Sequence, residues 1–315
     1  MEPDQHILVI KHGALGDIVL ATAGFKAIRE AYPAAHITAL TTKPFTNTLA
    51  HSPYFNEIWV DRKPRFFDRR GMRALRRMLN SRRWDFVFDL QTSQRTSFYQ
   101  WLFRHPWPRI SNVSRWSSDG YTDHARHGRH ALSNLQRQLA LVGVQAGLPD
   151  LSWLVEDSAE LLATIYGGPE PRPFALLVPG GAAHRPEKRW PAEQYAALAH
   201  ELAQRMIVPV LIGTDAEKEA LQEIAGRVPA AVNLGGKTSI RQLATLARSA
   251  HCAVGNDTGP MHIIAASHCP STVIFSHASD PARSAPQGRA VTILRERDLS
   301  QLSVDRVLTS LPSPA

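Results

Sequence analysis

Residues 253–266, AVGNDTGPMHIIAA, decide the fold because they join an apolar strand to a helix through a turn that contains glycine. The first three residues predict a buried strand, and the residues from Gly259 onward predict a helix. A helix that begins directly after a strand presents free backbone N–H groups and the positive end of its dipole, which suits a diphosphate. Asp257 or Thr258 could simply cap the helix and His262 could face the core, but capping does not account for the whole string. This turn therefore predicts a phosphate site.

The same alternation of short apolar runs and helical patterns extends through the chain. In the first half it predicts strands at residues 7–10, 36–40, 58–60, 86–90 and 109–113 and helices at 17–31 and 133–144. In the second half it predicts strands at residues 174–178, 207–212, 231–234, 253–255 and 271–275 and helices at 192–205, 216–227, 240–249 and 259–267. Because parallel strands need a crossover connection, this order predicts the α/β class, with doubly wound parallel sheets covered by helices on both faces.

The length and composition predict two folded domains. The chain has 315 residues, of which 43% are hydrophobic and 20% charged, which supplies enough apolar material for a core and excludes a disordered protein. Glycine and proline are too frequent between residues 157 and 173 for a helix or a strand, so we place the linker at 161–173. We predict an N-terminal domain over residues 1–160 and a C-terminal domain over residues 174–315, facing each other across a cleft. Ligands of such sheets bind beyond the carboxyl ends of the strands.

Several protein classes lack their signals in this sequence. Residues 1–5 have no basic segment of the kind that begins a signal peptide, and no apolar run reaches the ~18 residues of a membrane span, so we expect a cytoplasmic protein. Cys252 and Cys269 have neither the number nor the spacing of a disulfide framework or a zinc site, and we interpret them as buried thiols. No HExxH, paired CxxC, EF-hand or P-loop string occurs, so we expect no metal.

A second turn that opens a helix lies near the start of the chain, in residues 11–18, KHGALGDI. Gly13 and Gly16 are spaced GxxG and not GxGxxG, which disfavours a nicotinamide enzyme, and we expect no cofactor. Asp17 is either a first-turn acid favoured by the helix dipole or a general base at the carboxyl end of a strand. Both interpretations stay open on the sequence alone.

A third turn, in the second half, supplies small residues and a cation. The strand over residues 174–178 ends in PGGA, which contains Gly180 and Gly181, and Lys188 follows shortly before Pro191. Small residues let backbone amides approach an anion, and Lys188 could neutralise a phosphate. A surface cation beside a helix that starts at proline is the alternative.

The positive charge of the chain is concentrated in one segment. The net charge is +8, and residues 61–84, with ten Lys or Arg against two Asp, account for the whole excess. A helix is expected over residues 71–83, with Met72, Leu75, Met78 and Leu79 on one face and arginines on the others. Either this is a solvated basic helix, or it attracts a polyanion such as an anionic lipid headgroup or an acidic sugar acceptor. No nucleic-acid-binding signature accompanies the arginines, so we expect no nucleic-acid partner.

Taken together, GALGD at 13–17, PGGA at 179–182, KRWP at 188–191 and GNDTGPMHIIAA at 255–266 resemble glycosyltransferase family 9, the ADP-heptose:lipopolysaccharide heptosyltransferases. The resemblance spans both predicted domains. It implies the GT-B architecture, two Rossmann-like domains with the acceptor bound by the first and the nucleotide-sugar by the second. It also implies an inverting, metal-independent transfer of a heptose, with ADP-heptose as donor and an anionic lipopolysaccharide inner-core glycolipid as acceptor at the inner face of the cytoplasmic membrane.

The resemblance also implies roles for individual residues. Asp17 would be the catalytic base, Glu217 would contact the ribose, and Thr238 and Ile240 lie where the adenine is read. The donor-binding residues would be Gly180, Gly181, Lys188, Glu217, Thr238, Ile240, Asp257, Thr258, Gly259 and His262. The acceptor-binding residues would be Gly13, Gly16, Arg62, Arg65, Arg73, Arg76 and Arg77. Without a metal, a cation, a helix dipole and oriented amides must stabilise the departing diphosphate.

One stretch departs from the family pattern, and two other functions remain open. Residues 275–281 read FSHASDP, where the family often has a Tyr-Gly or similar turn, which leaves the contacts to the donor sugar undetermined. A sugar-nucleotide epimerase of the same architecture would need acid and base groups around the sugar in place of an acceptor site. A non-enzymatic, basic polyanion-binding protein is the third interpretation.

Overall fold

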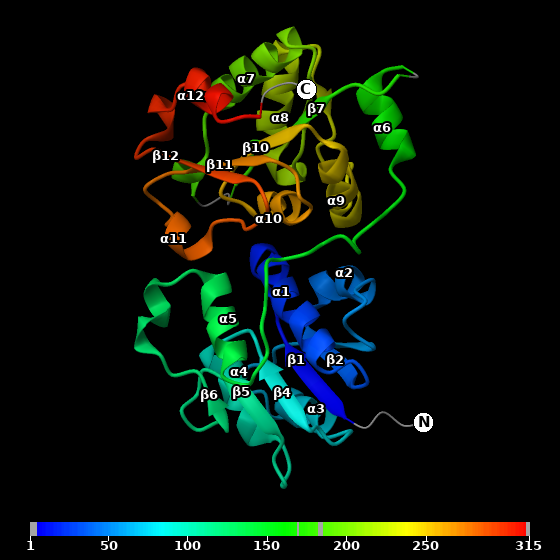
Figure 1. Ribbon diagram of the computed structural model, residues 1–315, viewed down its shortest axis with the longest axis vertical. Coiled ribbons are helices and arrows are strands. Elements are labelled where there is room, and N and C mark those ends of the chain that lie inside the picture. The colour runs from blue at the N-terminus through cyan, green and yellow to red at the C-terminus, as the bar shows by residue number, and fades with distance from the viewer. Residues whose placement is uncertain (1–4, 169, 182–184, 313–315) are drawn as a thin grey trace. The chain divides into compact units, whose positions relative to one another are not determined.

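The computed structural model describes residues 5–168, 170–181 and 185–312. The chain forms two compact units, Met1–Pro149 and Asp150–Ala315, each built on one six-stranded parallel sheet (Figure 1). Helices follow most strands and cover the sheets. The predicted α/β class with two doubly wound parallel sheets is confirmed.

The first unit has the strand order β3-β2-β1-β4-β5-β6. Its strands are β1 (His6–Ile10), β2 (His36–Thr41), β3 (Glu57–Val60), β4 (Phe86–Asp89), β5 (Arg109–Asn112) and β6 (Asp119–Gly120). Its helices are α1 (Leu15–Ala31), α2 (Thr46–Ala50), α3 (Arg69–Leu79), α4 (Gln94–Phe98) and α5 (Ala131–Ala140). In the register of β1 with its neighbours, Ile7 lies opposite Ile37 on β2 and Phe86 on β4.

The second unit has the strand order β12-β11-β10-β7-β8-β9. Its strands are β7 (Phe174–Val178), β8 (Val208–Leu211), β9 (Val232–Asn233), β10 (Cys252–Asn256), β11 (Ser271–Phe275) and β12 (Val291–Arg295). Its helices are α6 (Ala159–Tyr166), α7 (Ala192–Gln204), α8 (Lys218–Arg227), α9 (Ile240–Ser249), α10 (Gly259–Ala266), α11 (Pro281–Ser284) and α12 (Val304–Thr309). Cys252 and Cys269 are free and buried, as predicted.

Each sheet reverses its direction of winding next to its first strand. In the first unit the chain moves outward from β1 through β2 and β3 and then returns to β4, so the reversal lies between β1 and β4. In the second unit it lies between β7 and β10. All five residues of β7 and all five of β10 are buried, as expected for central strands covered on both faces. A doubly wound sheet opens a crevice for ligands at this reversal, beyond the carboxyl ends of the strands.

The predicted basic helix is present with slightly different bounds. It runs from Arg69 to Leu79 and not over residues 71–83. Asp68 caps its start by accepting from the Gly71 N–H at 2.9 Å, and at its end the Trp84 indole N–H donates to the Leu79 carbonyl at 2.7 Å. Leu75 and Leu79 are buried in the core of the first unit, and Met72 and Met78 pack against that core. The predicted apolar face is therefore confirmed.

The boundary between the units differs from the predicted linker at 161–173. Helix α6 begins at Ala159 and ends at Tyr166, where Gly167 adopts the left-handed conformation that closes helices. The glycine- and proline-rich stretch thus ends a helix and does not exclude one. The segment before α6 belongs by its contacts to the second unit, because Arg248 on α9 donates to the carbonyls of Leu151 and Leu154 at 3.2 and 2.8 Å.

Strand β12 was not predicted, because its burial alternates irregularly and its sequence has no clear period. Strand β6 has two residues and was also not predicted. In the described part of the chain, no helix has both the length and the apolar character that crossing a membrane requires.

Candidate active site

Asn256, the last residue of β10, ties together the turns that form the candidate site of the second unit. Its side chain is fully buried, and its amide nitrogen donates to the carbonyls of Pro179 and Gly180 at 2.8 and 3.0 Å. Its amide oxygen accepts from the Trp190 N–H at 3.0 Å and from the Tyr195 hydroxyl at 3.2 Å. One buried amide thus fixes the turn after β7 and the segment that leads into α7, and both flank the carboxyl end of β10.

Lys188 and Asp257 meet at this edge of the sheet. The Lys188 Nζ lies 2.8 Å from Asp257 Oδ2, and their side chains are 13% and 10% exposed. Asp257 follows β10 directly, whereas Lys188 ends a short 3-10 turn before α7. The structure therefore brings together two of the residues that the resemblance assigns to the diphosphate, although 69 positions separate them in the chain.

The N-terminus of α10 lies beside this pair. Thr258 is the N-cap residue in an extended conformation, and its side chain makes no capping hydrogen bond. The alternative in which Thr258 caps the helix through its hydroxyl is therefore wrong for this conformation. Pro260 has no N–H, and the Met261 N–H donates to the Thr258 carbonyl at 3.1 Å, so among the first three residues of α10 Gly259 keeps its N–H for an acceptor. His262, in contrast, is only 6% exposed and lies within the helix.

Glu217 lies between the turns after β7 and β8. Its Oε2 accepts from the Thr214 N–H at 2.8 Å and from the Thr214 hydroxyl at 2.6 Å, so it closes a capping box. A Cβ atom on Gly180 would lie 2.8 Å from the Glu217 Cγ, which explains why the turn after β7 needs glycine there. The Gly181 carbonyl accepts a hydrogen bond from the Arg189 guanidinium at 2.9 Å, which fixes this part of the turn.

A pocket of about 250 Å³ opens next to Glu217, beyond β8 and β9. Thr214 lines it, with two lysines, Lys218 and Lys237, and the apolar side chain of Leu221. Thr238 follows Lys237 directly and Ile240 lies two residues further on, and both are half-buried, but neither lines the pocket. The two residues assigned to adenine recognition therefore lie beside the pocket, at the start of α9.

In the first unit, the turn after β1 carries Gly13 and Asp17. Gly13 has a φ of 122°, and a Cβ atom there would lie 2.4 Å from the Phe45 ring, so both the backbone and the space require glycine. Gly16 lies in the first turn of α1. Asp17 is exposed, and its Oδ2 accepts from the Ala14 N–H at 3.2 Å. Asp17 is thus the first-turn acid of α1, and its carboxylate is also accessible from solvent.

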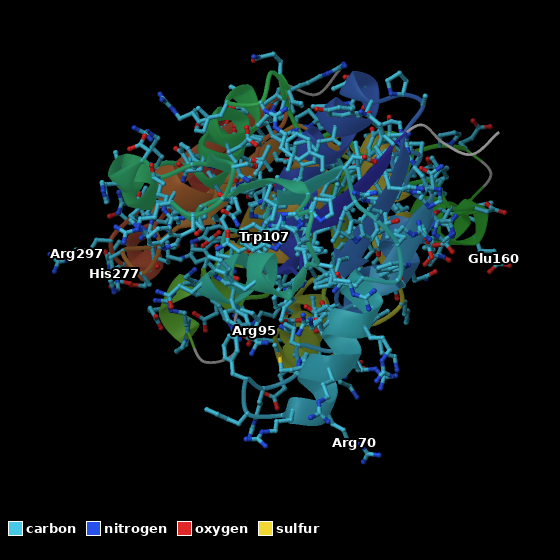
Figure 2. All side chains as sticks on the ribbon, turned by 90° about the horizontal axis from the view of Figure 1, so that it is seen from below. Arg70, Arg95, Trp107, Glu160, His277 and Arg297 are labelled. Carbon is cyan, nitrogen blue, oxygen red and sulfur yellow. The ribbon has the colours of Figure 1, made fainter. Side chains whose placement is uncertain are left out.

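A polar pocket of about 420 Å³ lies at the carboxyl ends of β1, β2 and β4, against the turn that holds Asp17. Gly13 and Ala14 form one side of it, and two cationic side chains, Lys63 and Arg95, form another (Arg95 in Figure 2). The remaining lining residues are His12, Thr42, Phe45, Gln91 and Ser93. The structure does not place the predicted acceptor cations in this pocket: Arg62, Arg65, Arg73, Arg76 and Arg77 are exposed and none of them lines it.

Buried hydrogen bonds to Asp61 support the floor of this pocket. The His12 Nε2 lies 3.0 Å from Asp61 Oδ2, the Tyr99 hydroxyl donates to the same oxygen at 2.6 Å, and the Lys63 N–H donates to Oδ1 at 2.7 Å. Burial by itself raises the pKa of Asp61, but these hydrogen bonds outweigh burial and hold that pKa below its ordinary value. A carboxylate that stays ionised fixes both His12 and the backbone of Lys63.

Two further ionisable groups lie under the same turns. Burial raises the pKa of Asp89, at the end of β4, to about 6, although its Oδ1 accepts from the Gln91 N–H at 3.0 Å. Burial also lowers the pKa of Lys11, against the attraction of Asp17 and Asp89, and the Lys11 Nζ donates to the Leu90 carbonyl at 3.1 Å. The Lys11 amine therefore lies beneath the turn that carries Asp17, close enough for Asp17 to act on its pKa.

Three features of these sites were not predicted. Asn256 lies within the GNDTGPMH motif, but no role was predicted for it. A polar residue at the end of a buried strand could have indicated that its side chain binds neighbouring turns. Lys63 and Arg95 gave no signal, because Lys63 lies within a run of cations and Arg95 stands outside every motif. Asp61 was counted only as an acid beside that run.

Comparison with known proteins places the chain in a family. The family model described as glycosyltransferase family 9 (heptosyltransferase) matches residues 72–309. A lipopolysaccharide core heptosyltransferase from Haemophilus influenzae is 24% identical over 310 residues, which cover 90% of this chain and 82% of that protein. A glycosyltransferase family 9 structure from Veillonella parvula has a TM-score of 0.83 at 23% identity, covering 98% of this chain and 97% of that one.

The structure of an E. coli ADP-heptose lipopolysaccharide heptosyltransferase II has a TM-score of 0.78 at 22% identity, covering 97% of both chains. These likenesses in structure agree with the GT-B type of fold, and the match to the family model extends through most of the chain. The enzyme class predicted from the short motifs is therefore confirmed. The chain belongs to glycosyltransferase family 9, the heptosyltransferases of lipopolysaccharide biosynthesis.

Proposed function

We propose that this enzyme transfers a heptose from ADP-heptose to an anionic inner-core acceptor, with inversion at the anomeric carbon and without a metal ion. The observation that carries the proposal is the Lys188–Asp257 pair, 2.8 Å apart beside the uncapped N-terminus of α10. A largely buried ammonium and the N–H of Gly259, at the positive end of the helix dipole, are groups that can stabilise the charge of a departing diphosphate. The similar E. coli structure is that of an ADP-heptose lipopolysaccharide heptosyltransferase, which supports the choice of nucleotide.

On the donor side, the proposed roles follow the positions of the turns. The Lys188 ammonium and the Gly259 N–H bind the diphosphate, and Asp257 orients the lysine. The glycines of the turn after β7, Gly180 and Gly181, let the backbone approach the phosphates. Glu217 contacts the ribose, and Thr238 and Ile240 border the adenine. His262 is buried within α10, so we propose that it supports the turn and does not touch the donor.

On the acceptor side, Asp17 is the proposed general base. Its carboxylate takes the proton of the acceptor hydroxyl while that oxygen bonds to the anomeric carbon and the bond from this carbon to the diphosphate oxygen breaks. ADP leaves with the electron pair of that bond, and attack from the opposite side inverts the configuration. Gly13 and Gly16 shape the turn that holds the base, and Lys63 and Arg95 provide positive charge in the pocket beside it. Arg62, Arg65, Arg73, Arg76 and Arg77 attract the anionic acceptor from outside the pocket.

The test is a transfer assay with ADP-heptose and a truncated lipopolysaccharide acceptor, analysed by mass spectrometry. We expect the acceptor to gain the mass of one heptose in the presence of a chelator. The Asp17→Asn variant should lose turnover by about 10²-fold or more while keeping its affinity for ADP, because the carboxylate acts on the acceptor. An unchanged acceptor together with an altered nucleotide-sugar would instead identify an epimerase, and full activity of Asp17→Asn would exclude its role as base.

A further inference from the structure

Three exposed tryptophans surround a pocket on the first unit that shares no lining residue with the pocket beside Asp17. Trp101, Trp107 and Trp116 are 48%, 59% and 66% exposed, and together they line a pocket of about 380 Å³. The rings of Trp101 and Trp107 meet edge to face with their centroids 5.9 Å apart (Trp107 in Figure 2). We name this feature the tryptophan pocket. Such a concentration of exposed aromatic surface marks an interaction site.

The polar side chains of the tryptophan pocket are already hydrogen-bonded within the chain. Gln100 donates to the Ser114 hydroxyl at 3.1 Å, and the Ser117 and Ser118 hydroxyls donate to backbone carbonyls at 2.8 and 3.2 Å. Arg109 makes two hydrogen bonds to Asp119, at 2.8 and 2.7 Å. Few polar groups are thus left to recognise the hydroxyls of a sugar, and the pocket offers mainly indole rings.

Unpaired cations border the same surface. Arg104 and Arg115 are exposed, and the Arg115 guanidinium lies 4.5 Å from the centre of the Trp116 ring. In the described part of the chain, no carboxylate lies within ion-pair distance of Arg104 or Arg115. The pocket therefore combines amphipathic rings with free positive charge.

The basic helix α3 is attached to this surface. The Asn80 side chain, just after α3, donates to the Leu102 carbonyl at 2.8 Å and accepts from the Arg104 N–H at 2.7 Å. The helix buries Leu75 and Leu79 in the core and exposes its arginines, and Arg70 points away from the body of the protein (Figure 2). At its other end, directly before the N-cap residue Asp68, Phe67 is 91% exposed. The exposed Phe67 ring thus lies just before α3 in sequence, and the hydrogen bonds of Asn80 hold the other end of the helix against the segment that carries Trp101 and Trp107.

We propose that the tryptophan pocket and α3 form a docking surface for an anionic lipid bilayer. Tryptophan rings are suited to the interface between headgroups and acyl chains, and exposed arginines are attracted to anionic headgroups, each contributing about fivefold to binding. This deepens the proposed function, since an acceptor glycolipid resides in such a bilayer. Docking nevertheless requires neither donor nor turnover, so it is tested independently of the transfer reaction.

The experiment measures binding of the full chain to vesicles of phosphatidylethanolamine and phosphatidylglycerol, and to vesicles of phosphatidylcholine alone, by co-sedimentation. We expect binding only to the anionic vesicles, and weaker binding at high salt because the arginine contribution is screened. The variant Trp107→Ser/Trp116→Ser should bind the anionic vesicles more weakly, by a factor of about ten or more. Both side chains are exposed, so the variant should fold. The control Leu141→Ser/Met206→Ser removes two exposed apolar side chains elsewhere and should bind as the unmodified chain does.

Lipids with brominated acyl chains distinguish insertion from charge attraction alone. We expect them to quench the tryptophan fluorescence of the unmodified chain, and to quench the double tryptophan variant much less. The variant should still transfer heptose to a lipid-free acceptor and lose activity only on acceptor in vesicles. Equal vesicle binding or equal quenching of both proteins would overturn the proposal, as would a soluble core oligosaccharide that occupies the pocket and quenches Trp107 in the absence of lipid.

Discussion

At the scale of single residues, Lys188 can serve either the ligand or the fold. Its ammonium lies 2.8 Å from Asp257, so it could exist only to neutralise that carboxylate. We expect Lys188→Ala to weaken ADP binding by about tenfold to a hundredfold, the equivalent of one charge-assisted hydrogen bond to a phosphate. Titration calorimetry measures this dissociation constant.

A second substitution separates the two roles. Lys188→Ala leaves Asp257 as a nearly buried, unpaired charge and should also lower the free energy of unfolding. In Lys188→Ala/Asp257→Asn the carboxylate is gone, so stability should return, whereas ADP affinity should stay low. If affinity returned together with stability, the lysine would only be compensating Asp257. Lys43→Ala, an exposed lysine in the first unit, is the control for loss of charge.

Asp89 makes stability depend on pH in a direction unusual for a carboxyl group. Because burial raises its pKa to about 6 in the folded chain, the folded state holds this proton more tightly than the unfolded state does. The stabilisation is complete below the unfolded pKa of about 4 and is lost as pH rises through about 6. Between pH 5 and pH 8 this group should lower the free energy of unfolding by about 1.5 kcal/mol.

The variant Asp89→Asn isolates that contribution. Its amide oxygen can still accept from the Gln91 N–H, but it does not titrate. Urea unfolding followed at pH 5, 6, 7 and 8 should therefore show a difference between the two proteins that grows with pH in favour of the variant. A constant difference across that range would mean that Asp89 does not titrate there.

The motifs predicted which residues lie together only where local sequence sets their position. Lys188 and Asp257 were predicted because each follows a strand in a recognisable turn. Lys63 and Arg95 were not, because only the folding of two separate loops onto the ends of β1, β2 and β4 brings them to one pocket. Exposed arginines in the same run, such as Arg73, have the same charge and a different location, and a single sequence carries no information that separates them.

At the scale of elements, the contact between α10 and its sheet positions the proposed phosphate site. Gly255 on β10 allows this contact, since a Cβ atom there would lie 2.5 Å from the Met261 sulfur and 2.8 Å from the Val178 Cβ. Gly255→Ala should therefore cost about 1 to 3 kcal/mol of stability and displace the N-terminus of α10, which weakens ADP binding. Thermal unfolding and calorimetric titration measure the two effects.

A matched glycine serves as the control for that substitution. Gly226, in helix α8, has no atom within 4 Å of the position of an added Cβ. Gly226→Ala should leave ADP binding unchanged and stabilise the helix by up to about 1 kcal/mol, because alanine is the better helix former. Equal effects of the two substitutions would show that the packing of α10 does not position the site.

The strands and helices were predictable where periodicity and length agree. The central strands β1, β7 and β10 are continuous apolar runs, as burial on both faces requires. Helix α6 was missed because proline and glycine at its end were interpreted as excluding it, and β12 was missed because its edge position leaves only part of it buried. In both cases tertiary contacts, and not local pattern, decide the element.

At the scale of the whole molecule, the two units have separate hydrophobic cores, so ligand stabilisation can be assigned to one of them. Cys252 lies in the core of the second unit. The other cysteine of the sequence, Cys269, is also buried in that unit. Thiol labelling therefore reports the opening of the second unit alone. Most tryptophans, in contrast, belong to the first unit and report its unfolding by fluorescence.

We expect ADP at a hundred times its dissociation constant to slow thiol labelling about a hundredfold, because a ligand that binds only the folded unit reduces the open population by that factor. Asp17→Asn should show the same protection, since its carboxylate acts on the acceptor, whereas Lys188→Ala should show less at equal ADP concentration. If ADP left thiol labelling unchanged and shifted only the fluorescence transition, the nucleotide would bind the first unit, and the division of donor and acceptor between the two units would be wrong.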